Sequence, residues 1–263
     1  MILLVAAAAV ESLRVPVLAL LLAAFLAAGL LARRPCAEGP ARHLLAYGGC
    51  LVVALNLAWG GVPLSAIIGT VATCADRLAP FAALRVVGAL LVLATLWLVI
   101  HLVHASPADI GLRWPSREWL VLSVVAVALV GAGAALLGPR LAEPFFGPIS
   151  PPTASLGALV PAILFALANA TMEEVAYRGA LLRWLTPAAG VVNALALQAF
   201  VFGLAHGVGT DFIGSPLPIM AATAAAGLVL GALALRTRSL LLPITIHLAL
   251  DIPVFYGKVC LGT

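Results

Sequence analysis

The sequence contains few charged residues, which make up 9% of the 263 residues, and Lys258 is its single lysine. Soluble domains carry about 25% charged and roughly 45–50% apolar residues. This chain is 64% hydrophobic, with a mean hydropathy of +1.19. The shortage of charge excludes a soluble globular domain and predicts an integral membrane protein. Long apolar runs that contain Gly and Pro are typical of transmembrane helices, whereas barrel strands alternate with period two.

Several catalytic and binding motifs are missing as well. The chain has no HExxH, no Ser in a GxSxG setting and no Gly-rich phosphate loop, so zincin chemistry, serine catalysis and phosphate binding are not expected. It also has no CxxC pair. Its scattered cysteines are therefore expected to be ordinary small apolar residues: Cys36, Cys50, Cys74 and Cys260.

The apolar segments predict an all-α, polytopic bundle of about seven to eight transmembrane spans, since one crossing needs about 20 residues. Segment 61–80 is broken by Pro63, Asp76 and Arg77 and is assigned to a loop. We divide the chain into N-terminal helices of unassigned role (1–104) and a core (105–263) whose last four spans carry the polar residues. The expected spans are 15–32, 43–60, 82–104, 118–138, 156–185, 188–207, 217–235 and 239–257.

The basic residues indicate topology and not a nucleic-acid partner, because the arginines stand singly or in pairs at the ends of apolar segments. The loops with arginines are predicted to be cytoplasmic: Arg33, Arg34 and Arg42, then Arg113 and Arg117, then Arg183, then Arg236 and Arg238. The other loops, 61–80, 139–155 and 208–216, are predicted to be external. Both termini are predicted to be external as well. A composition rich in Ala, Leu and Arg indicates a bacterial inner membrane.

Ionisable residues occur inside three of the last four spans: Glu173 and Glu174, then His206, then His247 and Asp251. A charge placed in hydrocarbon is expensive, so such residues usually face the interior of the bundle and serve a function. They are the main indication of a functional site in this chain.

Helical spacing relates these residues to one another. Glu174 and Arg178 are four residues apart and are expected to form an ion pair. Glu173 lies about 100° round the helix from Glu174. It is therefore predicted to be the freer carboxylate, which suits a general base. His247 and Asp251 share a helix face, so the carboxylate is expected to orient the imidazole.

Two further features concern packing. Gly227 and Gly231 form a GxxxG pair, which allows two helices to approach closely. Asn169 lies one turn before Glu173 and is placed to line the same cavity.

EEVAYR at 173–178, FGLAH at 202–206 and HLALD at 247–251 resemble the EExxxR, FxxxH and HxxxN/D motifs of the CPBP family. This family contains type II CAAX prenyl endopeptidases and bacteriocin-processing (Abi) intramembrane proteases. Each motif is short, but their order, their spacing and their location in apolar spans also match. The segment GLRWPSREW at 111–119 resembles a linker upstream in that family. The resemblance covers about residues 105–257.

The resemblance implies an endopeptidase that cleaves a membrane-associated peptide or protein. By position, Glu173 would activate a water molecule with His206, while His247 and Asp251 would stabilise the oxyanion or position the water. An ionised carboxylate cannot donate a hydrogen bond, so Asp251 is either protonated or orients His247. Three residues would support the site: Glu174, Arg178 and Phe202.

No cofactor is favoured, but Zn²⁺ is an alternative, since catalytic zinc takes three protein ligands and Glu173, His206 and His247 could supply them. Two other functions are open: an ion- or proton-coupled transporter, and a non-catalytic scaffold or immunity protein. The lack of an internal repeat disfavours the transporter. The bacterial-type composition favours a peptide or membrane-protein substrate over a prenylated CAAX tail.

Overall fold

The computed structural model describes residues 48–56, 73–102, 104–146, 156–207 and 215–260, and these form helices with no strand among them. The helices are α5 (Cys74–Leu102), α6 (Arg117–Phe146), α7 (Leu156–Glu173), α8 (Leu182–Ala189), α9 (Val191–Gly207), α10 (Leu217–Thr237) and α11 (Leu241–Val259). A 3-10 turn, η1 (Pro107–Ile110), precedes α6, and a π-helix, η2 (Glu174–Leu181), joins α7 to α8. Residues 48–56 are also helical. The predicted all-α fold is confirmed.

Four helical stretches are long and apolar enough to cross a membrane: Cys74–Leu102, Arg117–Gly138, Gly157–Ala189 and Leu217–Thr237. Val191–Gly207 and Leu241–Gly257 are apolar but shorter. The prediction of seven to eight full spans is therefore reproduced only in part over the described ranges. Span 15–32 lies outside them, and span 43–60 is described only as helix 48–56.

Three predicted boundaries are wrong. Helix α5 begins at Cys74, inside the expected loop 61–80, because Asp76 lies in its first turn and receives a hydrogen bond from Thr73 Oγ1 over 2.6 Å. Helix α6 continues to Phe146, into the expected loop 139–155. The break after α8 falls at Gly190, whose φ of 78° favours glycine. Charged residues and prolines near the ends of these helices were therefore wrongly assigned to loops.

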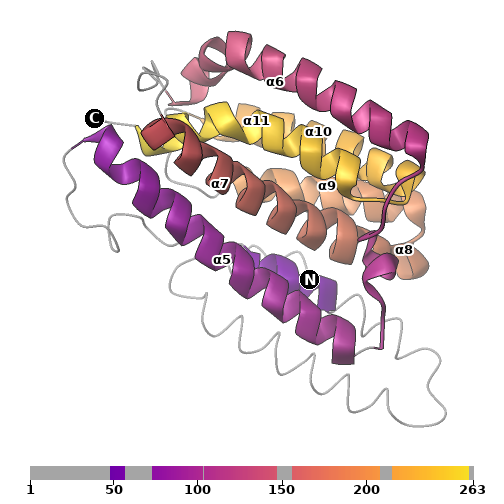
Figure 1. The fold of residues 1–263 in the computed structure, drawn as a ribbon. Helices are drawn as coiled ribbons and strands as arrows, with labels where there is room; N and C mark the ends of the chain where they lie inside the picture. Colours follow the sequence, from indigo (N-terminus) through magenta and orange to yellow (C-terminus); the bar gives the residue numbers. More distant parts are fainter. Residues whose placement is uncertain (1–47, 57–72, 103, 147–155, 208–214, 261–263) are drawn as a thin grey trace, which may run out of the picture.

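The helices stack in a fixed order. Helix α11 packs between α6 and α7, and α7 packs between α11 and α5. Figure 1 shows this stack, with α6 at one side and α5 at the other. Helices α9 and α10 pack on each other along their length. The residues singled out from the sequence lie on α7, η2, α9 and α11, so this packing determines how they meet.

The predicted GxxxG contact is present, and its partner is α9. A Cβ atom added to Gly227 would lie 3.0 Å from Ala199 Cα, and one added to Gly231 would lie 2.6 Å from Leu195 Cδ1. Larger residues would push the two helices apart, because part of the neighbour is backbone. The two glycines thus let α10 approach the helix that carries His206.

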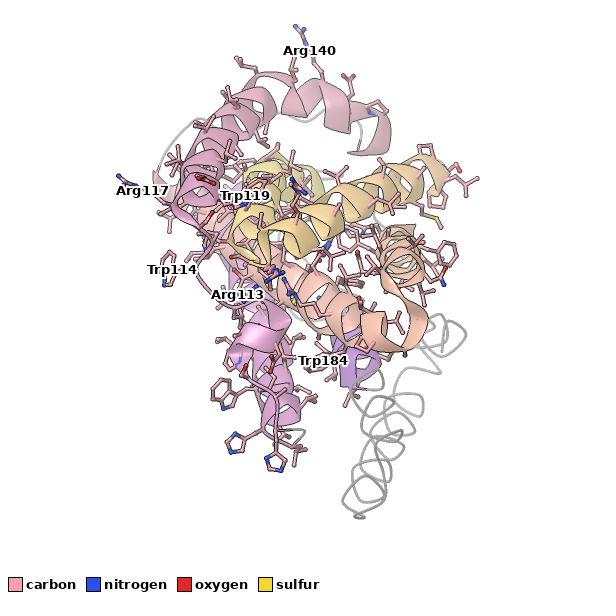
Figure 2. The ribbon with its side chains drawn as sticks, turned by 90° about the vertical axis from the view of Figure 1, so that its right-hand side faces the viewer. Arg113, Trp114, Arg117, Trp119, Arg140 and Trp184 are labelled. Atoms are coloured by element: carbon pink, nitrogen blue, oxygen red, sulfur yellow. A yellow bond between two sulfur atoms is a disulfide. The ribbon has the colours of Figure 1, made fainter. Side chains whose placement is uncertain are left out.

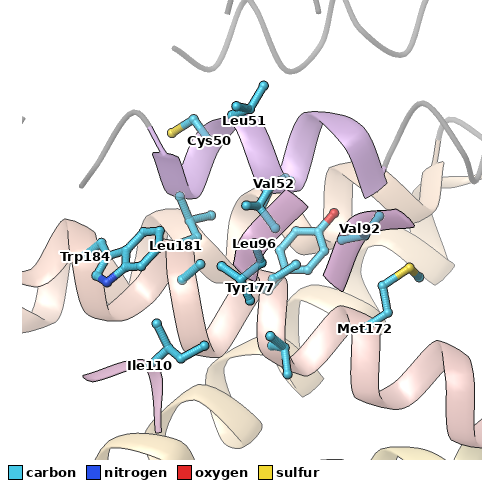
Figure 3. Close-up of a cluster of buried hydrophobic side chains, with 14 of the residues drawn as sticks. Cys50, Leu51, Val52, Val92, Leu96, Ile110, Met172, Tyr177, Leu181 and Trp184 are labelled. Carbon is cyan, nitrogen blue, oxygen red and sulfur yellow. The ribbon is translucent and has the colours of Figure 1, made fainter. Parts of the chain in front are cut away.

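A buried apolar cluster surrounds the π-helix. It joins helix 48–56, α5, η1 and η2, and includes Val52, Leu96, Ile110, Tyr177 and Leu181. Figure 3 shows these side chains spread along the π-helix, with Leu96 beside Tyr177. Helix 48–56 approaches η2 closely, because a Cβ on Gly49 would lie 3.1 Å from Leu181 Cα. Helix 48–56, α5 and η1 therefore pack directly on the segment that contains the EEVAYR motif.

Arginines from the last three predicted cytoplasmic loops lie at one end of the bundle, whereas Arg33, Arg34 and Arg42 lie outside the described residues. Arg113 Nε donates to the Arg238 carbonyl over 2.7 Å, and Arg183 Nη2 donates to the Ala234 carbonyl over 2.9 Å. Figure 2 views this end and shows Arg113 and Arg117 there. These three arginine-containing segments therefore share one end, as the topology prediction expects of loops on one side of a membrane.

A disulfide between Cys74 and Cys260 joins α5 to the end of α11 at the opposite end of the bundle. The prediction that both are ordinary apolar residues is wrong. Their separation of 186 residues in the sequence carried no pairing signal. Both lie in segments predicted to be external, where disulfides form and persist. The disulfide therefore agrees with the orientation inferred from the arginines.

We expect a Cys36→Ser/Cys50→Ser variant to take up no maleimide label in SDS before reduction and two labels after it, as measured by intact mass. In whole cells, a reductant that does not cross the membrane should suffice, because the bond lies at the external end. Two labels without reduction would contradict the disulfide. A bond that opens only with a membrane-permeant reductant would reverse the orientation.

Candidate active site

The EEVAYR motif lies where α7 ends and the π-helix begins. Glu173 is the last residue of α7, and Glu174 is the first of η2. Both are buried in the bundle. A π-helical segment inside an α-helix is rare and is frequent at functional sites. It widens the helix at this point, and both glutamates approach His247 on α11 although they are neighbours in sequence.

Glu174 holds both Arg178 and His247. Its Oε1 atom lies 2.9 Å from Arg178 Nη1 and 2.8 Å from His247 Nδ1. The predicted Glu174–Arg178 pair is therefore present, and both side chains are fully buried. A carboxylate only accepts hydrogen bonds, so the His247 proton at this contact is on Nδ1. Glu174 thus orients the imidazole of His247.

Asp251 is a weaker partner of His247 than the sequence suggested. Its Oδ1 atom lies 3.5 Å from His247 Nε2, which is longer than a good hydrogen bond. Its Oδ2 atom accepts a hydrogen bond from Asn169 Nδ2 over 2.8 Å. The role of orienting His247 therefore belongs to Glu174, and Asp251 is itself held by Asn169.

Glu173 faces both histidines with one carboxylate oxygen. Its Oε2 atom lies 3.9 Å from His206 Nε2 and 3.7 Å from His247 Nε2. His206 Nδ1 lies 2.8 Å from the Phe202 carbonyl, which can only accept, so this nitrogen carries the proton. In a neutral His206, the Nε2 atom that faces Glu173 is then an acceptor.

Phe202 lies among the charged and imidazole groups. The Arg178 guanidinium carbon is 3.9 Å from the centre of the Phe202 ring, within cation–π range. The Phe202 ring centre is 4.6 Å from that of His206 and 6.1 Å from that of His247. The FxxxH motif therefore supplies one apolar surface shared by the three.

Arg85 on α5 is the residue that sequence reasoning missed. Its Nη2 atom lies 2.8 Å from Glu173 Oε1, and its Nε donates to Asn169 Oδ1 over 2.5 Å. The prediction that Glu173 is the freer carboxylate is therefore wrong, because this arginine comes from a helix whose approach could not be inferred. A signal existed, since Arg85 is a charge inside the expected span 82–104.

The proposed metal ligands do not form a metal site as they are placed. In the parts of the chain that the structure describes, no group of three or more His, Cys, Asp or Glu side chains is arranged to hold an ion. Glu173, His206 and His247 do not fit a shared Zn²⁺ in this arrangement, and we derive no catalytic step through a metal.

Residues 155–252 match the protein-family model described as "Rce1-like: Type II CAAX prenyl endopeptidase Rce1-like". This segment includes the three motifs and lies within the predicted core; the division into 1–104 and 105–263 stays a prediction. Comparisons with curated proteins and with solved structures gave no match. The apolar helices and this match together describe an integral, multi-pass membrane protein. Residues 155–252 are thus similar to an Rce1-like domain of the type II CAAX prenyl endopeptidase kind, as the three motifs predicted.

Proposed function

We propose that this protein is an intramembrane endopeptidase that hydrolyses a peptide bond of a membrane-associated peptide or protein. The observation that supports this best is the pair of acceptors formed by Glu173 Oε2 and His206 Nε2, 3.9 Å apart. Two acceptors at this separation suit one water molecule that donates a hydrogen to each. Glu173 would hold and polarise this water and then accept its proton.

In the proposed reaction, Glu173 removes a proton from the water, and the hydroxide attacks the carbonyl carbon of the scissile bond. The carbonyl oxygen becomes an oxyanion. His247 Nε2 can donate to it when the ring is doubly protonated, because Nδ1 already donates to Glu174. The proton on Glu173 then passes to the leaving nitrogen, and the products are a carboxylic acid and an amine.

The substrate is proposed to be a peptide or membrane protein, with a prenylated C-terminal peptide as the second candidate because of the family match. The two candidates differ in the length of chain after the scissile bond and in the lipid modification. A panel that contains both kinds decides between them.

We expect the wild-type protein in liposomes to cleave at least one member of a panel of transmembrane and farnesylated peptides, with products identified by mass spectrometry. The Glu173→Gln variant should leave the same peptide intact. Cleavage should persist in a chelator, because the mechanism uses no metal. Loss in chelator with recovery on adding Zn²⁺ would contradict the metal-free mechanism. No cleavage of any peptide would favour the transporter or scaffold alternatives.

A further inference from the structure

We propose that Arg85, on a helix outside the segment that matches the family, is a positioning residue for the reaction. It holds Glu173 by one carboxylate oxygen and, through Asn169, holds Asp251. This inference rests on the proposed peptidase function. It also assigns a role to α5, which the three motifs do not include.

The contacts form a chain across three helices. Arg85 on α5 meets Glu173 and Asn169 on α7 at 2.8 and 2.5 Å, and Asn169 meets Asp251 on α11 at 2.8 Å. Asn169 and Asp251 are buried, and the Arg85 side chain is 16% exposed. Two of the four residues that the motifs place in the reaction are therefore linked to one guanidinium.

The chemistry of these groups determines which one donates and which one accepts in each hydrogen bond of the series. Arg85 only donates, and an ionised Asp251 only accepts. Asn169 must therefore offer its carbonyl oxygen to Arg85 and its amide hydrogens to Asp251. A leucine or an aspartate at position 169 could not make both contacts.

The arrangement orients Glu173 in a useful way. The guanidinium is a rigid, planar fork, and here it spans two side chains one helical turn apart. With Oε1 of Glu173 held by Arg85, Oε2 is the oxygen that faces His206 and His247. Rotation of the carboxylate would remove the acceptor that the proposed water needs.

Other contacts hold α5 in place without Arg85. The rings of Phe81, Phe165 and Phe255 join α5, α7 and α11, with centres 5.1 to 5.9 Å apart. The Cys74–Cys260 disulfide also joins α5 to α11. Loss of Arg85 should therefore disturb the site more than the fold, which separates a positioning role from a structural one.

The test compares Arg85→Met and Arg85→Lys with wild type in the liposome cleavage assay, with Arg117→Met as the matched control at an exposed arginine. We expect Arg85→Met to lower kcat about 100-fold, the size of loss that a small misplacement causes, with KM within about twofold. Arg85→Lys should recover part of the loss, because it restores one charged contact. The unfolding midpoint should fall less than in Arg178→Met, because Arg85 is partly exposed whereas Arg178 is fully buried.

Equal kcat in wild type and Arg85→Met would overturn the proposal. So would a loss that follows the unfolding midpoint and is not recovered by lysine. A cycle of Arg85→Met, Glu173→Gln and the double variant, measured by thermal unfolding in detergent, tests the contact without using activity. Non-additive midpoint shifts are expected, and strict additivity would contradict the contact.

The same measurements separate this inference from the proposed function. If the wild-type protein cleaves no peptide, the peptidase proposal fails, and with it the reaction for which Arg85 would position Glu173. Non-additive midpoint shifts would then support an ion pair between Arg85 and Glu173 without a role for it in a reaction. If the wild-type protein cleaves and Arg85→Met cleaves equally well, the peptidase stands and this inference fails.

Discussion

Replacing Glu173 with Gln is expected to lower the rate of peptide cleavage by about 10²–10⁴-fold, the usual contribution of a general base. The substitution keeps the size of the side chain and an oxygen that can accept from Arg85, so the neighbouring contacts can persist. It removes the basic oxygen that lies 3.9 Å from His206 and 3.7 Å from His247. The loss should appear in kcat, because no contact to bound peptide is assigned to this oxygen before the reaction.

The matched control is Glu118→Gln, which changes an exposed glutamate in the first turn of α6 and should leave the rate unchanged. Initial rates over a range of peptide concentrations measure both variants. Full activity of Glu173→Gln together with loss in Asp251→Asn would transfer the role of base to Asp251. That outcome would contradict the mechanism while keeping the peptidase.

Replacing Arg178 with Met is expected to lower the free energy of unfolding by roughly 3–5 kcal/mol, because it leaves a buried carboxylate without its cation. Arg178 and Glu174 are both fully buried, and the guanidinium also lies over the Phe202 ring. Glu174 holds His247 as well, so the uncompensated charge sits beside the imidazole that is proposed to stabilise the oxyanion. Methionine fills much of the space, so the loss would come mainly from the charge.

Reversible unfolding in mixed detergent micelles measures this effect. The double variant Glu174→Gln/Arg178→Met should be more stable than Arg178→Met alone, because it removes both charges. Arg140→Met, at an exposed position on α6, should change stability by less than about 0.5 kcal/mol. An Arg178→Met variant as stable as this control would contradict the buried ion pair.

Much of the site was predictable because the expected cost of charge in a membrane makes such residues conspicuous. Glu173, His206, His247 and Asp251 were named from that argument and from three short motifs, and the structure brings each of them within 3.9 Å of another of the four. The Glu174–Arg178 pair followed from helical spacing. Their roles in catalysis stay proposals.

The errors have a common origin in how far apart contacting residues are in sequence. Arg85 is 88 residues from Glu173, and Cys74 is 186 residues from Cys260. Helical periodicity relates residues a few positions apart and carries no information on such pairs. The π-helix was also missed, because an apolar run with a few polar residues does not distinguish it from an α-helix.

The order of amino acids was sufficient to predict a membrane protein, an all-helical fold and the similarity of residues 155–252 to type II CAAX prenyl endopeptidases, because each depends on composition or local spacing. Packing decided which partner each charge has. Because α5 approaches α7, Glu173 pairs with Arg85. Because α11 approaches η2, the close carboxylate partner of His247 is Glu174 and not Asp251. Buried charges take the nearest group that compensates them, and which group is nearest depends on how the helices pack.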